Sequence, residues 1–359
     1  MSGIGFSDAR ARVRGLVDGA KRIADASTEV SRRARAELVG TTGLSLEGVE
    51  LALAECLETD VGERELAGFC ANVEPARRAH VLLSANVFVA AHRAVALALA
   101  ASARVFVRSS RREPVFARLL AEAAPGLFEI VSELAPEPGD AVFAYGADET
   151  LAAVRLKLPP GVAYHPHGAG IGVAFVDRAH ATRETACALA LDVSLFDQRG
   201  CLSPRVVIFS GSDAEARAFA ELVAAELAAL ALRVPLGSLD PDEAADVTAF
   251  RDAVTYAGSA FAAGPGWVAL GVREEFAVAP VGRNLLFVPS DDAVRLLAPR
   301  APRIAALGFA TSSALEEEVA QALPGARRSA LGRMQRPPFD GPVDRRPLSV
   351  RLLVPSSSG

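Results

Sequence analysis

The sequence predicts an α/β protein in which a helical segment precedes two sheet-containing domains. From residue 80 onwards, short apolar runs alternate with Ala-rich segments, and this alternation occurs in two successive series. Continuous apolar strands joined by helices are typical of buried parallel sheets built from βαβ units. The 359 residues are 51% hydrophobic and 23% charged, a composition that favours more than one buried core and argues against disorder or a coiled coil.

Residues 1–75 are expected to form helices. Ser7 and Asp8 are N-cap candidates for a long segment rich in Arg and Ala, because oxygen-bearing side chains accept hydrogen bonds from the first N–H groups of a helix. Ser45 is the N-cap candidate for a second helix, whose apolar residues recur at helical spacing up to Leu57.

The first series, residues 76–195, has the pattern of a Rossmann-type nucleotide cofactor-binding domain. Its helices are expected over 93–101, from 113, over 148–157 and over 182–193. Its strands are expected at 81–83, 104–108, 128–131, 141–145 and 173–176. A Pro at an early helical position, as at 114, costs little because that N–H has no helical partner.

The second series, residues 196–325, predicts a second α/β domain. Its helices are expected over 213–232 and 242–261, and its strands at 206–209, 267–270, 285–288 and 304–307. Residues 326–359 form a tail that becomes proline-rich from about residue 331. We expect this tail to lack regular structure and to pack on the cofactor domain or on a partner subunit.

Charge and composition exclude several classes of function. The net charge is −5 and the 38 basic residues are spread along the chain, so no nucleic-acid footprint is expected. The apolar runs are much shorter than the ~20 residues of a membrane span, and the N-terminus lacks the pattern of a signal peptide. We therefore expect a soluble cytoplasmic protein. The four cysteines lie too far apart for CxxC metal pairs, so no metal site is expected.

Cys201 is the strongest candidate for a reactive group. It follows a Gly in the loop 197–205, which also holds two Arg residues, and such surroundings expose a thiol and lower its pKa. The alternative is a buried structural cysteine, because cysteine is among the residues most often buried. Cys56, Cys70 and Cys187 fit that structural role better.

Five short segments give the sequence a family resemblance. They are residues 84–88, 107–114, 144–148, 167–170 and 200–201. Their succession resembles the aldehyde dehydrogenase superfamily, in which an Asn, a Lys-Pro-Ser segment, a Thr-Gly-Ser turn, a Glu-Leu-Gly-Gly segment and a Gly-Gln-x-Cys segment occur in the same order. Within that superfamily, residues 197–204, 167–168 and 332–338 are similar to the bacterial fatty acyl-CoA reductase branch, the LuxC family.

The resemblance implies roles for three residues. Cys201 takes the place of the nucleophile, and Asn86 that of a donor to the oxyanion formed on attack; Asn86 reads equally well as a turn residue that ends a strand. His167 stands where oxidising members have a Glu that activates water. The loss of that carboxylate favours a thioester reductase over an acid-forming dehydrogenase. His167 is either an acid–base group or a residue that orients its loop.

The cofactor implied by the resemblance is a nicotinamide dinucleotide. After the second strand the chain has Arg108, Ser110, Arg111 and Arg112 where the family usually has Lys-Pro-Ser-Glu. Ser110 with either following Arg suits the 2′-phosphate of NADPH, and NADH is the alternative cofactor. If these residues have no role in cofactor binding, they form a solvated Arg-rich loop at the end of the sheet. By the same resemblance Gly146 belongs to the cofactor turn.

Glu275 completes the candidate cofactor set. It lies in a Glu-Glu-Phe segment, residues 274–276, that looks like the family's contact to the nicotinamide ribose. A solvated charge pair is the equal alternative.

The favoured function is NADPH-dependent reduction of an acyl thioester, most simply acyl-CoA, to the aldehyde through a Cys201 thioacyl-enzyme. One alternative is an aldehyde or semialdehyde dehydrogenase of the same superfamily. Another is a catalytically silent homologue that acts as a scaffold. A homo-oligomer and an acyl-transferring partner enzyme are further expectations.

Overall fold

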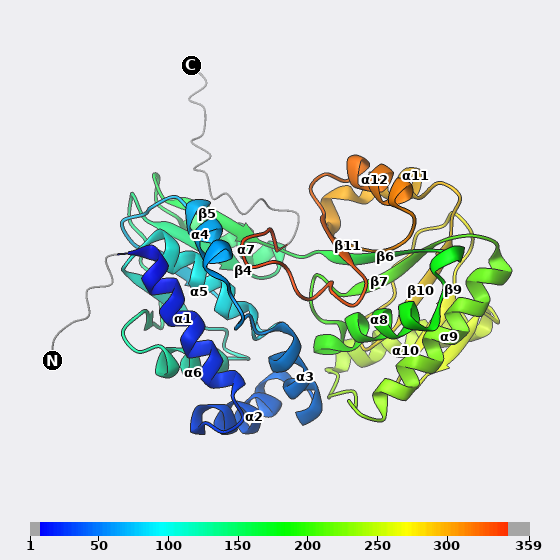
Figure 1. Ribbon diagram of the computed structural model, residues 1–359, viewed down its shortest axis with the longest axis horizontal. Helices are drawn as coiled ribbons and strands as arrows, with labels where there is room; N and C mark the ends of the chain where they lie inside the picture. The colour runs from blue at the N-terminus through cyan, green and yellow to red at the C-terminus, as the bar shows by residue number, and fades with distance from the viewer. Residues whose placement is uncertain (1–7, 344–359) are drawn as a thin grey trace, which may run out of the picture.

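The computed structural model describes residues 8–343. They form two parts that lie side by side, each a β-sheet covered by helices (Figure 1). A five-stranded sheet has the order β3-β2-β1-β4-β5, and a seven-stranded sheet has the order β12-β11-β6-β7-β10-β9-β8. The α/β class with two sheets is therefore as predicted. We call the two parts the five-stranded unit and the seven-stranded unit.

Four helices open the described chain: α1 (Ala9–Ala24), α2 (Glu29–Thr42), α3 (Leu46–Cys56) and α4 (Glu63–Ala71). Asp8 caps α1 by accepting from the N–H of Arg10, and Ser45 caps α3 by accepting from the N–H of Gly48. Ser7 lies outside the described residues. The apolar faces of these helices share one core with the five-stranded sheet, so the helices are part of that unit and have no separate core.

The five-stranded sheet is wholly parallel. Its strands are β1 (Ala79–Leu82), β2 (Val105–Arg108), β3 (Glu129–Ile130), β4 (Ala141–Tyr145) and β5 (Ala163–His167), and its helices are α5 (Ala90–Ala101), α6 (Val115–Ala123) and α7 (Asp148–Lys157). The strand order reverses between β1 and β4. In open parallel sheets, ligands bind beyond the carboxyl ends of the strands at such a reversal.

The seven-stranded sheet is parallel except for the β8–β9 pair. Its strands are β6 (Ile171–Asp177), β7 (Pro204–Ser210), β8 (Ala260–Ala263), β9 (Gly266–Leu270), β10 (Leu285–Pro289), β11 (Ile304–Ala310) and β12 (Arg327–Ala330). Its helical segments are η1 (Arg178–His180), α8 (Arg183–Ser194), η2 (Leu195–Gln198), α9 (Asp213–Ala231), α10 (Pro241–Tyr256), α11 (Ala293–Leu297), η3 (Ala298–Arg303) and α12 (Ser313–Ala322). The central strands are buried almost throughout, which explains their continuous apolar runs.

The structure differs from the sequence-based expectations in several places, among them helices α11 and α12, which were not expected. The chain passes from one sheet to the other at residues 168–170, before the boundary expected at 195, because β6 pairs with β7 and β11. Helix α10 ends at Tyr256, since Gly258 takes a left-handed conformation (φ 68°) that stops a helix, and β8 follows. Two further edge strands were not predicted, because β5 contains Pro166 and β12 begins with two Arg residues.

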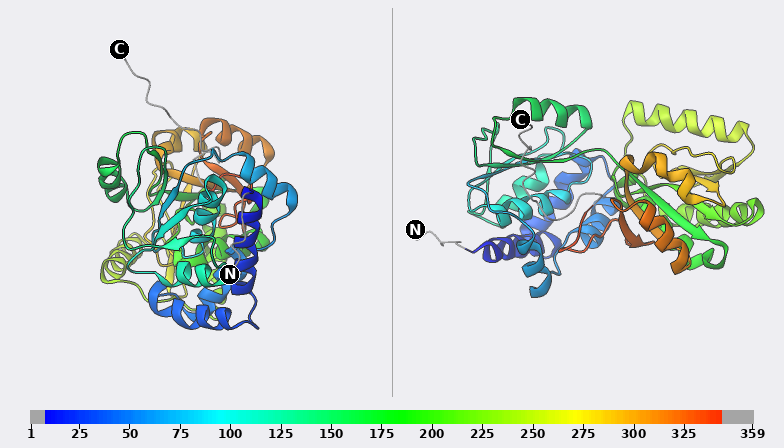
Figure 2. Two further views of the ribbon diagram at one scale, coloured as in Figure 1. Left: turned by 90° about the vertical axis from the view of Figure 1, so that its left-hand side faces the viewer. Right: turned by 90° about the horizontal axis from the view of Figure 1, so that it is seen from above.

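The C-terminal strap, residues 331–343, returns from β12 to the five-stranded unit (Figures 1 and 2). The buried Arg93 guanidinium donates to four of its carbonyl groups, at Pro337, Pro338, Phe339 and Gly341. The Phe339 ring also packs on Phe69, with centroids 4.5 Å apart. The predicted tail can be followed to residue 343, and Pro347 lies outside the described residues.

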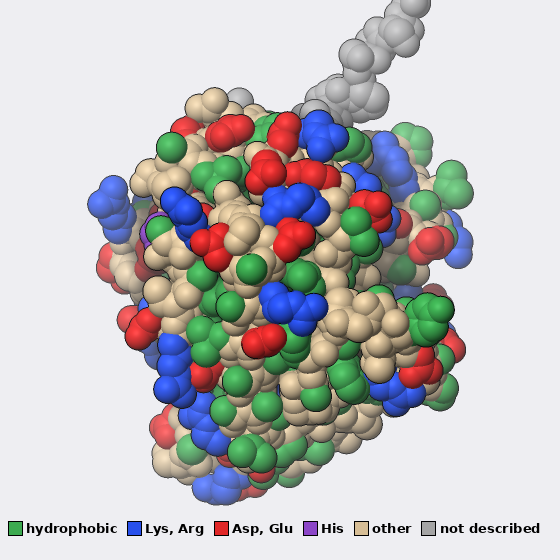
Figure 3. Space-filling model, turned by 90° about the vertical axis from the view of Figure 1, so that its right-hand side faces the viewer, with side chains coloured by type: hydrophobic (Ala, Val, Ile, Leu, Met, Phe, Trp, Pro, Cys, Tyr) green, Lys and Arg blue, Asp and Glu red, His purple; other side chains and the backbone are tan. Residues whose placement is uncertain are grey.

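Charged side chains of both signs share one face of the molecule, and the described helices are short or polar. Figure 3 shows a face of the seven-stranded unit on which basic and acidic side chains of the described residues are interspersed. Between residues 8 and 343, every helix is too short or too polar to cross a membrane.

Candidate active site

A cavity of about 560 Å³ lies between the two units. Its walls are built from the carboxyl ends of four strands of the five-stranded sheet, the loop before β7 and the C-terminal strap. The segments that supply these walls are 84–87, Ser110 and Arg112, 145–147, 167–170, 199–202, and Gln335 with Pro337, and further lining residues include Cys56, Glu58 and Arg93. The cavity thus opens where the strand order of the five-stranded sheet reverses, between β1 and β4.

The cavity brings together six of the nine predicted site residues. These are Cys201, Asn86, His167, Ser110, Arg112 and Gly146. Three others do not line it: Arg108 is half-buried at the end of β2, and Arg111 and Glu275 are exposed. The roles that the sequence predicts for all nine residues stay predictions.

Cys201 lies in a tight turn that leads into β7. The N–H of Ser203 donates to the Gly200 carbonyl at 3.1 Å and closes this turn around the thiol. The N–H of Gly172 donates to the Ser203 carbonyl at 3.1 Å, and a Cβ at Gly172 would lie 2.5 Å from the Leu202 carbonyl oxygen. Glycine at 172 therefore lets the thiol-bearing turn lie directly against β6.

The other cysteines differ in their surroundings. Cys56 also lines the cavity, but it is buried, and burial raises the pKa of its thiol. A thiol held protonated in this way is a poor nucleophile. Cys70 and Cys187 lie away from the cavity, which leaves Cys201 as the half-buried thiol at its wall.

The residues just before the thiol have an uncommon backbone. Phe196, Asp197 and Gln198 take φ values of 56°, 49° and 69°, a left-handed conformation that costs L-residues about 1–2 kcal/mol each. The Gln198 amide is fully engaged: its nitrogen donates to the Pro204 and Asn284 carbonyls at 2.7 and 2.6 Å, and its oxygen accepts from the Asn284 N–H at 2.9 Å. The turn is therefore held from both sides.

Asn86 is oriented by an Arg of the predicted cofactor segment. The Arg112 guanidinium donates to the Asn86 Oδ1 atom, so the two N–H groups of the Asn86 amide remain as donors. The Ser110 hydroxyl accepts from the Arg112 N–H at 3.2 Å. Glu113, by contrast, is buried and caps α6, since it accepts from the N–H groups of Val115 and Phe116.

His167 and Tyr145 form a flat aromatic pair at the cavity wall. They are neighbours in the β4–β5 register, and their rings stack 4.3 Å apart with an interplanar angle of 7°. His165, two residues earlier on the same strand, does not line the cavity: its ring stacks on Phe143, and burial lowers its pKa to about 4. His165 is therefore neutral at physiological pH, and His167 is the histidine that borders the cavity.

Glu58 is the one carboxylate among the described residues that line the cavity. Both of its oxygens accept from the Arg93 guanidinium. Burial by itself would raise the pKa of Glu58, but the charge of Arg93 and the hydrogen bonds that Arg93 donates outweigh burial and lower it. A carboxylate bound in this way is a weak base.

A buried carboxylate fixes the strap beside the thiol. Asp192 accepts from the N–H of Gly332 at 2.6 Å and from that of Met334 at 3.0 Å. The next residue, Gln335, donates from its amide to the Ser203 hydroxyl at 2.7 Å. Burial outweighs these backbone hydrogen bonds and raises the pKa of Asp192 to about 7.

Several residues of this site were not among the sequence-based candidates. Arg199 and Gln335 fall inside the segments 197–204 and 332–338 that carried the family resemblance, so those motifs contained the signal. Tyr145 was detectable through its position at the end of a predicted strand. The Glu58–Arg93 pair spans 35 positions and the Asp192–Met334 contact spans 142, and neither leaves a local pattern.

Solved structures with the same fold are aldehyde dehydrogenases. A putative aldehyde dehydrogenase from Burkholderia cenocepacia has a TM-score of 0.70 at 17% identity, covering 97% of this chain and 86% of that one. Lactaldehyde dehydrogenase from Escherichia coli has a TM-score of 0.65 at 16% identity, covering 90% and 78%. These likenesses show that the chain has the aldehyde dehydrogenase fold.

The family follows from a second comparison. Residues 128–344, more than half of the chain, match the model of the acyl-CoA reductase (LuxC) family, and the chain belongs to that family. This confirms the resemblance seen in the sequence. A search of curated proteins finds no match.

The cavity suits a dinucleotide cofactor. It lies beyond β1 and β4 at the reversal of the strand order, where nucleotides bind in open α/β sheets. Gly146 at this edge has free space around it, because an added Cβ would meet only Thr150 atoms at 3.9 Å. Ser110 and Arg112 at the same edge offer a hydroxyl and a guanidinium to a phosphate.

Proposed function

We propose that this protein reduces an acyl thioester of the acyl-CoA type to the aldehyde, with NADPH as the hydride donor and Cys201 as the nucleophile. The observation that carries the proposal is the composition of the cavity. A half-buried thiol, an amide donor and a histidine line the cavity. The one carboxylate among the described lining residues is already paired with Arg93. Such a site suits acyl transfer to sulfur better than hydrolysis.

The chemistry begins with attack of the Cys201 thiolate on the thioester carbonyl carbon. The N–H groups of the Asn86 amide, whose Oδ1 accepts from Arg112 before the cofactor binds, donate to the oxyanion. As the oxyanion collapses, the coenzyme A thiolate leaves and the acyl group stays on the Cys201 sulfur.

Reduction follows on the same sulfur. NADPH, when bound, would supply the hydride for this step, and the thioacyl group on Cys201 would become a thiohemiacetal. Asn86 again stabilises the charge on oxygen, and collapse of the thiohemiacetal releases aldehyde and regenerates the thiolate. Ser110 and Arg112 would hold the 2′-phosphate, and the stacked His167 and Tyr145 rings border the reaction space.

The test of the nucleophile is Cys201→Ala, with Cys187→Ala as its control. Cys187 is an exposed thiol remote from the cavity, so its loss should leave the rate unchanged. We expect Cys201→Ala to abolish acyl-CoA reduction while its thermal midpoint stays close to that of the wild type. Reduction by the Cys201→Ala variant at the wild-type rate contradicts the proposal.

A second experiment separates reductase from dehydrogenase. Incubated with acyl-CoA and no reduced cofactor, the protein should accumulate an acyl adduct on Cys201 and release little free acid, because Glu58, the one carboxylate among the described residues that line the cavity, is paired with Arg93. His167→Glu should accelerate acid release, and His167→Gln serves as its uncharged control. Rapid multiple-turnover hydrolysis by the wild type would instead identify a dehydrogenase with a displaced base.

A further inference from the structure

Asp197, at the centre of the left-handed turn, is held by a buried ion pair. The Arg283 guanidinium donates to Asp197 Oδ1 from Nε at 2.9 Å and from Nη2 at 2.6 Å. Both residues are 1% exposed. The Gly282 N–H donates to the Asp197 carbonyl at 3.1 Å, and Arg283 itself has a positive φ of 66°. The two strained turns therefore hold each other in place. Strained backbone conformations persist only where such surrounding contacts fix them.

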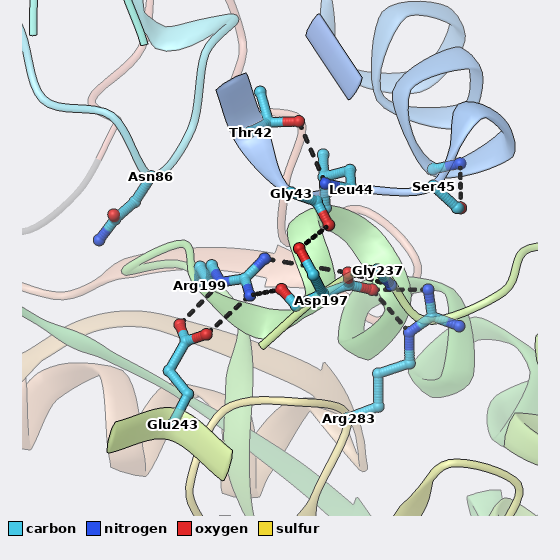
Figure 4. A network of polar contacts seen from close by, with 12 residues as sticks. Thr42, Gly43, Leu44, Ser45, Asn86, Asp197, Arg199, Gly237, Glu243 and Arg283 are labelled. Carbon is cyan, nitrogen blue, oxygen red and sulfur yellow. Dashed lines mark hydrogen bonds and ion pairs between the residues drawn. The ribbon is translucent and has the colours of Figure 1, made fainter. Parts of the chain in front are cut away.

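A third segment completes the contacts of Asp197. The Gly237 N–H donates to Asp197 Oδ2 at 2.9 Å, and Arg283 donates to the carbonyls of Val234 and Pro235 at 2.6 and 3.2 Å. Residues 234–237 are thus fixed against the turn. Figure 4 shows Asp197 with Arg199 on one side and Gly237 with Arg283 on the other.

Gly237 also contacts the five-stranded unit. A Cβ at this position would lie 2.0 Å from the Gly43 carbonyl oxygen and 2.7 Å from the Leu44 Cα, so only glycine fits without moving the backbone. The adjacent Ser238 N–H donates to the same Gly43 carbonyl at 2.7 Å. Gly43, between α2 and α3, is left-handed with φ 72°. The contact therefore joins two backbones that belong to different units.

We propose that Gly237 and Arg283, neither of which lines the cavity, are positioning residues that set the direction of the Cys201 thiol. They do so by fixing Asp197 between the Gly43 turn of one unit and the start of β10 in the other. The expected effect on the reaction rate rests on the proposed function. The expected effect on the position of the Cys201 turn relative to the cavity does not depend on that function.

The test compares Gly237→Ala with Gly40→Ala. Gly40 lies on the neighbouring helix α2, and a Cβ there would have no atom within 4 Å, so Gly40→Ala should behave as the wild type. In Gly237→Ala the new methyl group must push residue 237 away from Gly43 and draw its N–H from Asp197. A shift of this size near a reacting group costs about 10- to 100-fold in rate.

We expect kcat for Gly237→Ala to fall about 10- to 100-fold, while the KM for NADPH stays within about twofold. The second readout is the rate at which iodoacetamide alkylates Cys201, followed by peptide mass across a pH series. This rate, or its midpoint pH, should change in Gly237→Ala and not in Gly40→Ala. Arg283→Lys should retain more of the wild-type alkylation profile than Arg283→Met, because it keeps a cation beside Asp197.

The outcomes are separable. If Gly237→Ala has the kcat and the alkylation profile of Gly40→Ala, the positioning role is overturned, whether or not the Arg283 variants fold. Alkylation follows the thiol itself, so this readout tests the position of Cys201 without assuming its role in the reaction. If alkylation changes in Gly237→Ala but Cys201→Ala retains full activity, the positioning role stands and the proposed function fails.

Discussion

Replacing Asp192 by Asn should remove a pH dependence of stability that this buried carboxylate creates. Its pKa is raised from 3.8 to about 7 by burial, so the folded state binds the proton more tightly than the unfolded state. Unfolding therefore releases a proton between about pH 4 and pH 7, and stability from this group is full below pH 4 and lost as the pH rises through 7. Asn at 192 carries no such proton.

The expected size follows from the two pKa values. Between pH 5 and pH 8 the wild type loses about two pKa units of stabilisation, or about 3 kcal/mol, and most of this loss occurs below pH 7. Urea unfolding gives the difference in the free energy of unfolding between Asp192→Asn and the wild type. From pH 5 to pH 8 this difference should shift by that amount in favour of Asp192→Asn. The exposed Asp252→Asn controls for buffer effects. A difference that stays constant, or changes in the opposite direction, would refute the reasoning and show that the N–H groups of Gly332 and Met334 keep the carboxylate charged.

Three further predictions test the site. Arg112→Ala should raise the KM for NADPH much more than that for NADH, whereas Arg111→Ala, which lies off the cavity, should do little; equal effects would remove Arg112 as the reader of the 2′-phosphate. Gly172→Ala should lower the free energy of unfolding by about 1–3 kcal/mol in urea titrations, and no loss would mean that the turn moves freely. Arg93→Met should lower stability by about 3–5 kcal/mol, because Glu58 is left unpaired, and speed tryptic cleavage within the strap; unchanged cleavage would show that other contacts hold it.

Local patterns in the sequence were sufficient for the class of fold and for the thiol. The runs at 141–145 and 206–209 are continuous because their strands are buried on both faces, and Cys201 followed a Gly in a recognisable segment. Edge strands such as β12 carry no such run, since only one side of them pairs.

The conformation of the site could not be predicted in the same way. Phe196, Asp197 and Gln198 have no local preference for three consecutive left-handed residues. Their conformation depends on Arg283 and Asn284, which lie 86 positions further along the chain. The contacts of Asp192 and Arg93 with the C-terminal strap span still more of the chain, so they exist only once the strap has docked.

The strap gives the molecule a second covalent crossing between its units, in addition to residues 168–170. Two bodies joined at two points can turn relative to each other only about the line through those points, so sliding and twisting in other directions would strain the backbone. Both crossings border the cavity. Any opening of the site is therefore expected to be a rotation with one degree of freedom, whose axis passes beside the thiol and whose largest displacements occur far from it, at the outer helices.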